Sequence, residues 1–360
     1  MKILVTGGRG QLAHALGLIA ELSGAQVKVS PFDDQSTGAI NVGTQRELLG
    51  YLPEAASCLS EQDEIYLLAH QQLDICDPVS IDAAFKHIKP DVLINCAAYN
   101  AVDKAEVDVD IAYQINAQGP KLLAEQCKRD EVTLIHISTD FVFSGDRGSA
   151  YDEQVSPSPI SVYGKSKLAG ENTVLQILGH QAYIIRTAWL YSAWQQNFVK
   201  TMQQLFRSRD NISVIDTQRG SPTWCESLAV VIFKLVKIAM NERKQCNQGN
   251  KSSLSGDALS CGDNIYHYAG YGHCSWFDFS RRIQELMGKT GSKSHCTINP
   301  ISTECWQKLH PNPLAARPTN SGLCSDKILA EISMEQDSLI RASWQEQLKV
   351  MLAVQALSEG

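Results

Sequence analysis

A tyrosine and a lysine stand four positions apart in the stretch "SPISVYGKSKLAGE", which spans Ser158 to Glu171. Four residues make slightly more than one helical turn, so Tyr163 and Lys167 are expected on one helix face, within reach of a common partner. A neighbouring ammonium group favours the phenolate and brings the pKa of a tyrosine down from its ordinary value near 10. The pair is therefore a candidate proton-transfer device, although the same spacing also occurs on inert helix surfaces.

Hydroxyl groups follow the apolar run "VTLIHIST" (132–139), which ends in Ser138 and Thr139 and is followed by Asp140. A hydroxyl at a strand end can polarise a carbonyl group as an oxyanion-type donor. The alternative is a Ser/Thr pair that merely ends a strand and starts a turn. Together with the tyrosine and lysine, the donor role is favoured.

A glycine-rich turn lies in "KILVTGGRGQLAHALGLIAEL", between a buried strand and a helix with apolar residues at helical spacing. Gly7 permits the tight turn, Gly10 lets the backbone approach a pyrophosphate, and Ala13 is small where the helix packs on the sheet. Phosphate groups then sit on the N-terminus of the helix. The turn predicts dinucleotide binding.

Length and charge set further limits. A chain of 360 residues with 44% hydrophobic residues can bury an ample core, and a net charge of -7 offers no basic field for nucleic acid or anionic lipid. The 11 cysteines are scattered, without zinc spacing, and are expected to be reduced thiols. There is no signal-like start and no apolar run of about 18 residues, so the expected compartment is the cytoplasm, without a membrane segment.

Further apolar runs alternate with helical segments. Strands are predicted at 64–69, 91–99, 132–139 and 182–191. This alternation predicts an α/β fold with a Rossmann-type, doubly wound parallel sheet. The functional edge of such a sheet is at the carboxyl ends of its strands. These ends carry Gly7–Gly10, His70–Gln71, Ala97–Asn100 and Ser138–Asp140.

Two domains are predicted. Residues 1–185 should form the dinucleotide-binding domain, and 186–360 mainly a smaller α/β substrate domain with some segments returning to the first. An insertion at about 24–63 is expected at the sheet's periphery, where it leaves the glycine turn intact. The polar segment 241–264 is expected to be a surface loop.

Several motifs together resemble one family. "TGGRGQLA", "LDICDP", "DVLINCAAYNAVDKAE", "HISTDFVFSG", "SVYGKSKLAGE", "IIRTAWLY", "YHYAGYGHCSWFDFSRRI" and "ARPTNSGL" span nearly the whole chain. They resemble the dTDP-4-dehydrorhamnose reductases, which are extended short-chain dehydrogenases/reductases. Some of these motifs are common to all extended members, whereas "AVDKAE", "STDFVF" and "RPTNSGL" in this order are more specific. The two polar segments depart from the family pattern.

The resemblance implies a chemistry for the strand-end and helix residues. Tyr163 protonates the C4 oxygen of a keto-sugar while NAD(P)H delivers hydride to C4, and Lys167 also hydrogen-bonds the nicotinamide ribose. Thr139 hydrogen-bonds the substrate carbonyl, and Asp140 lies beside the sugar. The family usually has Tyr after this Asp; here Phe141 removes that hydroxyl.

The resemblance also implies two substrate contacts further along the chain. Trp189 lines the sugar pocket, where a flat indole suits an apolar sugar face; the alternative is a tryptophan buried in the core. Arg317 lies near the nucleotide end, where its guanidinium fork suits a diphosphate; the alternative is a surface ion pair.

Cofactor choice depends on which strand is second. If it is 64–69, no carboxylate follows at His70 or Gln71, and NADPH is acceptable and slightly favoured over NADH. If it is 25–30, Asp33 or Asp34 would grip the ribose and favour NADH. We prefer the first, with Asp74 and Ile75 as adenine neighbours. The predicted cofactor-binding residues are Gly7, Gly10, Gln11, Leu12, His70, Asp74, Ile75, Ala97, Ala98, Tyr99, Tyr163 and Lys167.

The resemblance predicts reduction of dTDP-4-dehydrorhamnose to dTDP-L-rhamnose. The alternatives are another nucleotide-sugar 4-reductase or epimerase of this fold, and a non-catalytic NADP-binding subunit resembling methionine adenosyltransferase beta. Some family members form homodimers with bound magnesium, but no carboxylate cluster here is specific enough to assign a metal site.

Overall fold

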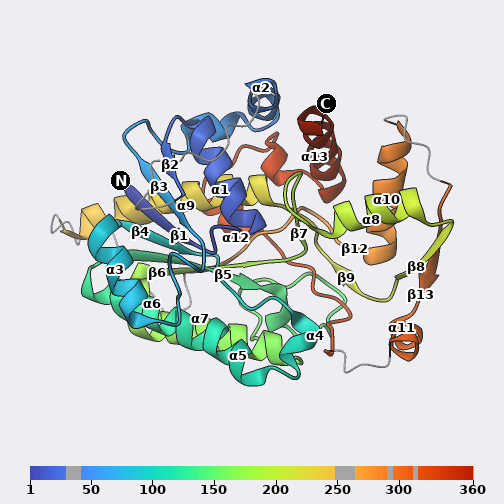
Figure 1. Cartoon of the computed structure of the whole chain (residues 1–360), viewed down its shortest axis with the longest axis horizontal. Coiled ribbons are helices and arrows are strands. Elements are labelled where there is room, and N and C mark those ends of the chain that lie inside the picture. The colour runs from blue at the N-terminus through green and yellow to red at the C-terminus, as the bar shows by residue number, and fades with distance from the viewer. Residues whose placement is uncertain (30–41, 248–263, 290–294, 311–314, 360) are drawn as a thin grey trace.

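A seven-stranded parallel sheet forms the centre of the molecule in this computed structural model, which describes residues 1–29, 42–247, 264–289, 295–310 and 315–359 (Figure 1). Its spatial order is β11-β6-β5-β4-β1-β3-β2. The strands are β1 (Lys2–Thr6), β2 (Gln26–Lys28), β3 (Glu64–Leu68), β4 (Val92–Asn95), β5 (Thr133–Thr139), β6 (Ala182–Thr187) and β11 (Ile265–His267). The predicted doubly wound fold is therefore confirmed.

Helices cover both faces of this sheet (Figure 1). One face carries α3 (Pro78–Ile88), α6 (Gly119–Arg129) and α7 (Val162–Leu178). The other carries α1 (Gln11–Leu22), α2 (Val42–Tyr51), α9 (Cys225–Asn247), α12 (Asp326–Glu331) and α13 (Trp344–Glu359). Near the strand ends lie α4 (Val102–Ala105) and α5 (Val109–Tyr113). No described helix is long and apolar enough to cross a membrane.

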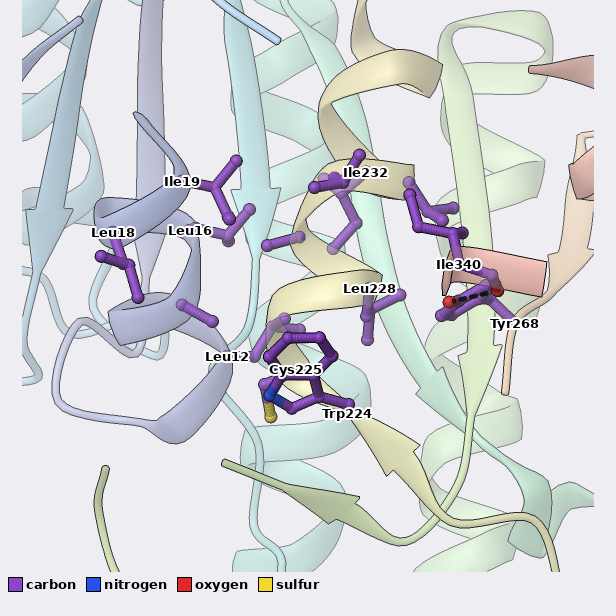
Figure 2. Packing of buried hydrophobic residues seen from close by; sticks show 14 of the residues in the cluster. Leu12, Leu16, Leu18, Ile19, Trp224, Cys225, Leu228, Ile232, Tyr268 and Ile340 are labelled. Atoms are coloured by element: carbon purple, nitrogen blue, oxygen red, sulfur yellow. Dashed lines mark hydrogen bonds between the residues drawn. The ribbon is translucent and has the colours of Figure 1, made fainter. Parts of the chain in front are cut away.

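Alternation along the buried strands divides the core in two. In β1, Ile3 and Val5 face the side of α1 and α9, whereas Leu4 faces the side of α3 and α7. Figure 2 shows the first side, where Leu12 of α1 approaches Trp224, the last residue of β10 (Thr223–Trp224), and Cys225 at the start of α9. Because both faces are covered, the strands are apolar throughout.

Short strands and helices build the region at the right of Figure 1. Its strand pairs are β7 (Leu190–Tyr191) with β10 (Thr223–Trp224), β9 (Arg219–Gly220) with β12 (Cys274–Ser275), and β8 (Asn211–Ile215) with β13 (Thr297–Ile301). Its helices are α8 (Phe198–Ser208), α10 (Trp276–Lys289) and α11 (Thr303–Leu309). From the same half of the chain, β11 returns to pair with β6 in the main sheet. The division at residue 185 stays a prediction.

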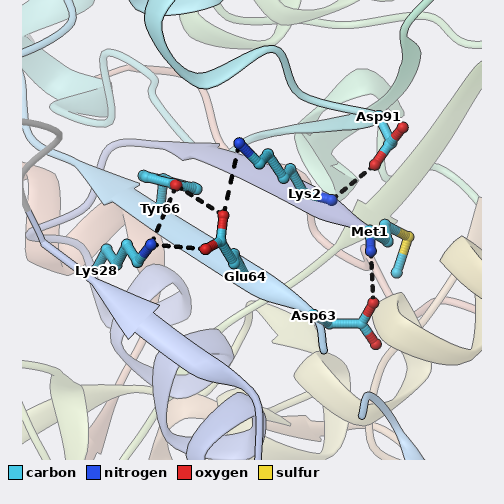
Figure 3. Close-up of polar contacts among 7 residues, drawn as sticks. All are labelled: Met1, Lys2, Lys28, Asp63, Glu64, Tyr66 and Asp91. Carbon is cyan, nitrogen blue, oxygen red and sulfur yellow. Dashed lines mark hydrogen bonds and ion pairs between the residues drawn. The ribbon is translucent and has the colours of Figure 1, made fainter. Parts of the chain in front are cut away.

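The insertion at 24–63 adds an edge strand to the sheet. Strand β2 pairs with β3 and not with β1, and the ammonium group of Lys28 lies 2.7 Å from the Glu64 carboxylate (Figure 3). Strand β3 pairs directly with β1. The stretch 64–69, which we preferred as the second strand, therefore lies next to the strand that leads into the glycine turn. The competing stretch 25–30 also forms a strand, but at the edge. Asp33 and Asp34 lie outside the described residues.

Residues of the same insertion also enter the main core. Leu48 and Leu52 are fully buried among the apolar residues on the α1 side. The segment is thus an integral part of the fold as well as a peripheral addition. A second expectation is wrong in part: residues 241–247 continue helix α9 and do not form a loop. The rest of that polar segment, up to residue 263, lies outside the described residues.

Replacing Leu52 with Ala is expected to lower the free energy of unfolding by about 2–5 kcal/mol, because it leaves a cavity in this core. Urea unfolding measures this change, and Leu357→Ala, at a side chain that is 45% exposed, is the control. The affinity for NADPH should stay unchanged in Leu52→Ala. A loss below about 0.5 kcal/mol, as at an ordinary surface position, would show that the insertion is not packed as described.

Candidate active site

The glycine turn presents bare backbone to the carboxyl edge of the sheet. Gly7 has a φ of 67°, which side chains rarely adopt, and its carbonyl accepts a hydrogen bond from the Gly10 N–H at 2.8 Å. A Cβ on Gly7 would lie 3.0 Å from the backbone of Ala97. Gly10 caps helix α1 without a side-chain bond. The N–H groups at Gln11 and Leu12 therefore remain for an anion, which fits a pyrophosphate.

The segment after β4 forms a second wall of this edge. The Ala97 nitrogen lies 3.2 Å from the Thr6 hydroxyl oxygen and 3.2 Å from the side-chain oxygen Oδ1 of Asn95, and the next residue, Ala98, is half-buried. Tyr99 is held on both sides by Asn116, which accepts from its N–H at 2.8 Å and donates to its carbonyl at 3.1 Å. These hydrogen bonds hold the backbone of Ala97–Tyr99 in one conformation.

The sequence did not lead us to predict Asn116 as a residue of the site. It is buried within a π-helical turn, Gln114–Gln118, between α5 and α6. Such turns are rare and are frequent at functional sites. The available signal was an Asn in a helical segment just before Gly119 and Pro120, where a helix is easily distorted.

At the end of β3 the predicted adenine-side residues differ in exposure. The His70 side chain is open to solvent, and its Nδ1 lies 3.8 Å from the Asp74 carboxylate. Asp74 itself accepts from the Cys76 N–H at 2.8 Å. The Ile75 side chain is buried and packs against Gly119 at the start of α6. An adenine contact from Ile75 would therefore involve its backbone, and these roles stay predictions.

Tyr163 and Lys167 lie one turn apart on α7, as the spacing predicts. Helix α7 begins after Ser161, whose hydroxyl accepts from the Gly164 N–H at 3.1 Å. The Tyr163 hydroxyl lies 3.5 Å from the side-chain oxygen Oδ1 of Asn100, and the Lys167 ammonium donates to the Ile137 backbone carbonyl at 2.7 Å. Both side chains are buried, so the pair is not an exposed helix surface.

The pKa of Tyr163 is shifted in the opposite direction to the sequence expectation. Burial raises its pKa to about 12, a hydrogen bond with Thr139 acts to lower it, and the charge of Asp140 acts to raise it. Burial also lowers the pKa of Lys167 to about 8. Because its pKa lies far above 7, Tyr163 holds its proton at neutral pH.

Thr139, the last residue of β5, hydrogen-bonds with Tyr163, whereas Ser138 points to the face of the sheet that α7 covers. Successive strand residues alternate in direction, and Ser138 donates to Glu171 of α7. The Thr139 hydroxyl donates to the Asp140 carboxylate at 3.0 Å. Burial raises the pKa of Asp140 to about 6. Phe141 packs edge-on against the Tyr163 ring, with centroids 5.6 Å apart.

Trp189 is held in an unusual backbone conformation. Its φ is 46°, so the predicted strand 182–191 breaks into β6 and β7 at this residue. Its half-buried indole stacks on Trp276 with centroids 3.4 Å apart, and a Cβ on Gly220 would lie 2.5 Å from it. The side chain is therefore clamped in place. Its role as a sugar platform stays a prediction.

Arg317 makes a two-pronged ion pair with Asp103 of α4, with both N–O distances 2.8 Å. Burial acts to raise the pKa of Asp103, but the bonds and charge of Arg317 outweigh it and the pKa is lowered. The ion-pair alternative is thus present in the structure, and diphosphate binding stays a prediction. Asp103, in the "AVDKAE" motif, was not predicted to pair with Arg317.

Acidic and sulfur side chains do not assemble into a metal site in the described part of the chain, where no group of three or more His, Cys, Asp or Glu residues could hold a metal ion. The nine described cysteines form no disulfide with one another.

Comparison with known proteins places this geometry in context. The family model described as "RmlD substrate binding domain" matches residues 1–356. A dTDP-4-dehydrorhamnose reductase from Aggregatibacter actinomycetemcomitans is 33% identical over 287 residues, covering 79% of this chain and 88% of the relative. A dTDP-4-keto-6-deoxy-D-glucose reductase from Streptomyces niveus is 33% identical over 226 residues, covering 63% of this chain and 71% of the relative.

A solved structure is similar over nearly the whole length. It is a dTDP-4-dehydrorhamnose reductase from Bacillus anthracis in complex with NADP, with a TM-score of 0.70 and 32% identity. The match covers 98% of each chain.

Proposed function

The chain belongs to the RmlD substrate binding domain family, and on this premise we propose that it reduces dTDP-4-dehydrorhamnose to dTDP-L-rhamnose with a nicotinamide cofactor. The observation that carries the proposal is that Tyr163, Lys167 and Thr139 converge at the edge of the sheet within a chain that matches this family over residues 1–356. The chain is thus an NAD(P)H-dependent oxidoreductase.

The cofactor fits the backbone at the sheet edge. The glycine turn and the free N–H groups at the start of α1 suit its pyrophosphate, and Lys167 suits the hydroxyls of its nicotinamide ribose. When bound, the reduced nicotinamide supplies hydride for C4 of the keto-sugar. The backbone of Ala97 lies against Gly7, and bonds to Thr6 and Asn116 hold the segment Ala97–Tyr99 in place beside the glycine turn.

Protein groups complete the reduction. With substrate bound, the Thr139 hydroxyl turns from the Asp140 carboxylate to the C4 carbonyl oxygen, where it stabilises the negative charge that develops as the carbonyl is reduced. Tyr163 then gives its proton to that oxygen, so hydride and proton together convert the ketone to an alcohol. Buried Asp140 lies next to Thr139 and can accept a sugar hydroxyl. Trp189 is the proposed sugar platform, and Arg317 the proposed contact to the nucleotide end.

NADPH is expected to bind at least as tightly as NADH. Strand β3, next to β1, is followed by Ala69, His70 and Gln71, and none of these three residues carries a carboxylate that would repel a 2'-phosphate. Fluorescence titration of both reduced cofactors measures the two dissociation constants. NADH preferred by more than tenfold, about 1.4 kcal/mol, would show that an acidic group elsewhere grips the ribose.

The relative from Streptomyces niveus is named for a different keto-sugar, dTDP-4-keto-6-deoxy-D-glucose. A panel of nucleotide-4-keto-sugars, each tested for NADPH oxidation, distinguishes the candidates. We expect dTDP-4-dehydrorhamnose to give the highest kcat/KM. A higher value with another sugar would reassign the substrate, and no turnover with any sugar would favour a non-catalytic NADP-binding subunit.

An epimerase normally retains tightly held NAD. Gel filtration of the purified protein, followed by absorbance at 340 and 260 nm, shows whether the protein retains bound cofactor. We expect the cofactor to leave on dilution, as a reductase that turns over NADPH requires; a full equivalent of retained NAD would support the epimerase alternative.

A further inference from the structure

Trp276 is the first residue of α10 and lies in the motif "YHYAGYGHCSWFDFSRRI", which the proposed reaction does not use. Its indole stacks on that of Trp189, with the two ring planes 6° apart and the ring centroids 3.4 Å apart. Both side chains are half-buried. Because two large flat rings in such close contact restrict each other, the orientation of the Trp189 ring depends on Trp276.

Trp189 lies at the carboxyl edge of the sheet, just after the strand next to the one that carries Thr139. Thr187, the last residue of β6, pairs in register with Thr139, and Trp189 follows two residues later. Its indole packs against the buried cluster that contains Val142 and Phe143, which come shortly after Thr139 in the chain. The indole is therefore placed beside the hydroxyl that is proposed to bind the keto group.

The backbone of Trp189 needs support to keep this place. Its φ of 46° lies in the left-handed region, which a bulky residue adopts only where contacts around it compensate for the strain. The Thr223 N–H donates to the Trp189 carbonyl at 3.2 Å and holds the backbone. Gly220 lies close to the ring, since a Cβ there would come within 2.5 Å of the indole. The stack on Trp276 holds the ring itself.

Trp276 is anchored through both its backbone and its ring. Helix α10 begins with a capping box, in which the Ser275 hydroxyl accepts from the Asp278 N–H at 3.0 Å and the Asp278 carboxylate accepts from the Ser275 N–H at 3.2 Å. The Ser275 hydroxyl also donates to Asp216 at 2.6 Å. The Phe198 ring of α8 packs against the Trp276 ring with centroids 4.4 Å apart. Trp276 is therefore a rigid support.

We propose that Trp276 is a positioning residue for the sugar: its indole holds the Trp189 ring in place, so that a keto-sugar packed on that ring keeps its carbonyl at the reaction centre. A sugar ring presents C–H groups on its apolar face, and these pack against a flat aromatic surface of fixed orientation. The inference rests on the proposed function for the task of Trp189.

The test is a double-mutant cycle in the full-length protein, with Trp276→Leu, Trp189→Leu and the variant that carries both changes. We expect Trp276→Leu to raise KM for dTDP-4-dehydrorhamnose roughly 3–10-fold, the usual effect of losing an aromatic pair. The change in kcat should be smaller, because the platform contacts the sugar alike before and during the reaction. Since Trp276 acts through Trp189, the double variant should have the same KM as Trp189→Leu.

Two further measurements separate positioning from folding. The affinity for NADPH should stay unchanged in all three variants. Stacked indoles give an exciton signal in circular dichroism, which Trp276→Leu and Trp189→Leu should both lose. Trp276→Phe keeps a flat ring and should restore most of the wild-type KM.

Trp306→Leu is the matched control. Trp306 is also half-buried, and its ring stacks on that of His310 in the following turn, with centroids 4.1 Å apart. The change should leave both KM and the exciton signal as in the wild type.

A Trp276→Leu protein with wild-type KM would overturn the inference, as would independent effects of the two changes that multiply in the double variant. If Trp276→Leu does not fold, Gly220→Ala takes its place, because a Cβ there would displace the Trp189 indole; a wild-type KM in that variant would overturn the inference instead. A wild-type KM in Trp189→Leu would contradict the proposed role of Trp189 and this inference with it, whereas a raised KM in Trp189→Leu alone would contradict only the inference.

Discussion

Tyr163→Phe should lower kcat for keto-sugar reduction on the order of 10²–10⁴-fold, the usual contribution of a positioned acid-base group. The change removes one hydroxyl and keeps the ring, so the edge-on packing against Phe141 survives. The hydroxyl lies 3.5 Å from the side-chain oxygen Oδ1 of Asn100, a contact too long to contribute much to stability, and its hydrogen bond with Thr139 contributes about 1 kcal/mol. Folding and NADPH affinity should therefore remain near those of the wild type.

Steady-state kinetics measures the loss of kcat, and NADPH titration of the same proteins measures the cofactor affinity. Tyr271→Phe removes a hydroxyl from a side chain that is 73% exposed and is the control. If Tyr163→Phe retains full keto-sugar reduction, the proton comes from another group and the pair on α7 has only a structural role.

Lys167→Met should lower both NADPH affinity and kcat. The ammonium is proposed to hydrogen-bond the ribose, and a bond to a charged group contributes about 1.5–3 kcal/mol, or roughly 10–100-fold in the dissociation constant. Loss of the same charge also removes the help that it gives to the developing phenolate of Tyr163, so kcat should fall at least about 10²-fold.

The matched control is Lys165→Met, on the same helix but exposed to solvent. It should change neither quantity. A Lys167→Met protein with wild-type affinity for NADPH and a lowered kcat would show that the ammonium acts on the tyrosine alone. Such a result would remove the ribose contact from the mechanism.

Much of the fold could be predicted because local patterns and long-range packing agree. Strands such as 132–139 are apolar runs, since both faces of a covered parallel sheet are buried. The insertion strand Gln26–Lys28 was harder, because an edge strand of three residues carries little periodicity. The break at Trp189 could not be predicted, since its positive φ depends on Trp276 and Gly220, which are distant in sequence.

The site was predictable to a similar degree. Residue spacing placed Tyr163 and Lys167 on one helix face, and strand ends placed Thr139 beside them. The direction of the pKa shift of Tyr163 was not predictable, because it depends on how completely the ring is buried. Partners such as Arg186 for Glu171 and Asp103 for Arg317 come from tertiary contacts that no local pattern encodes.

The most direct measurement follows the hydride itself. The protein is mixed with dTDP-4-dehydrorhamnose and NADPH that carries deuterium at the reactive position of the nicotinamide, and the sugar product is examined by NMR and mass spectrometry. We expect dTDP-L-rhamnose with deuterium at C4 of the sugar, formed in equal amount to the NADP released. Binding of both compounds without transfer of deuterium to C4 would contradict the assignment of this chain as the reductase.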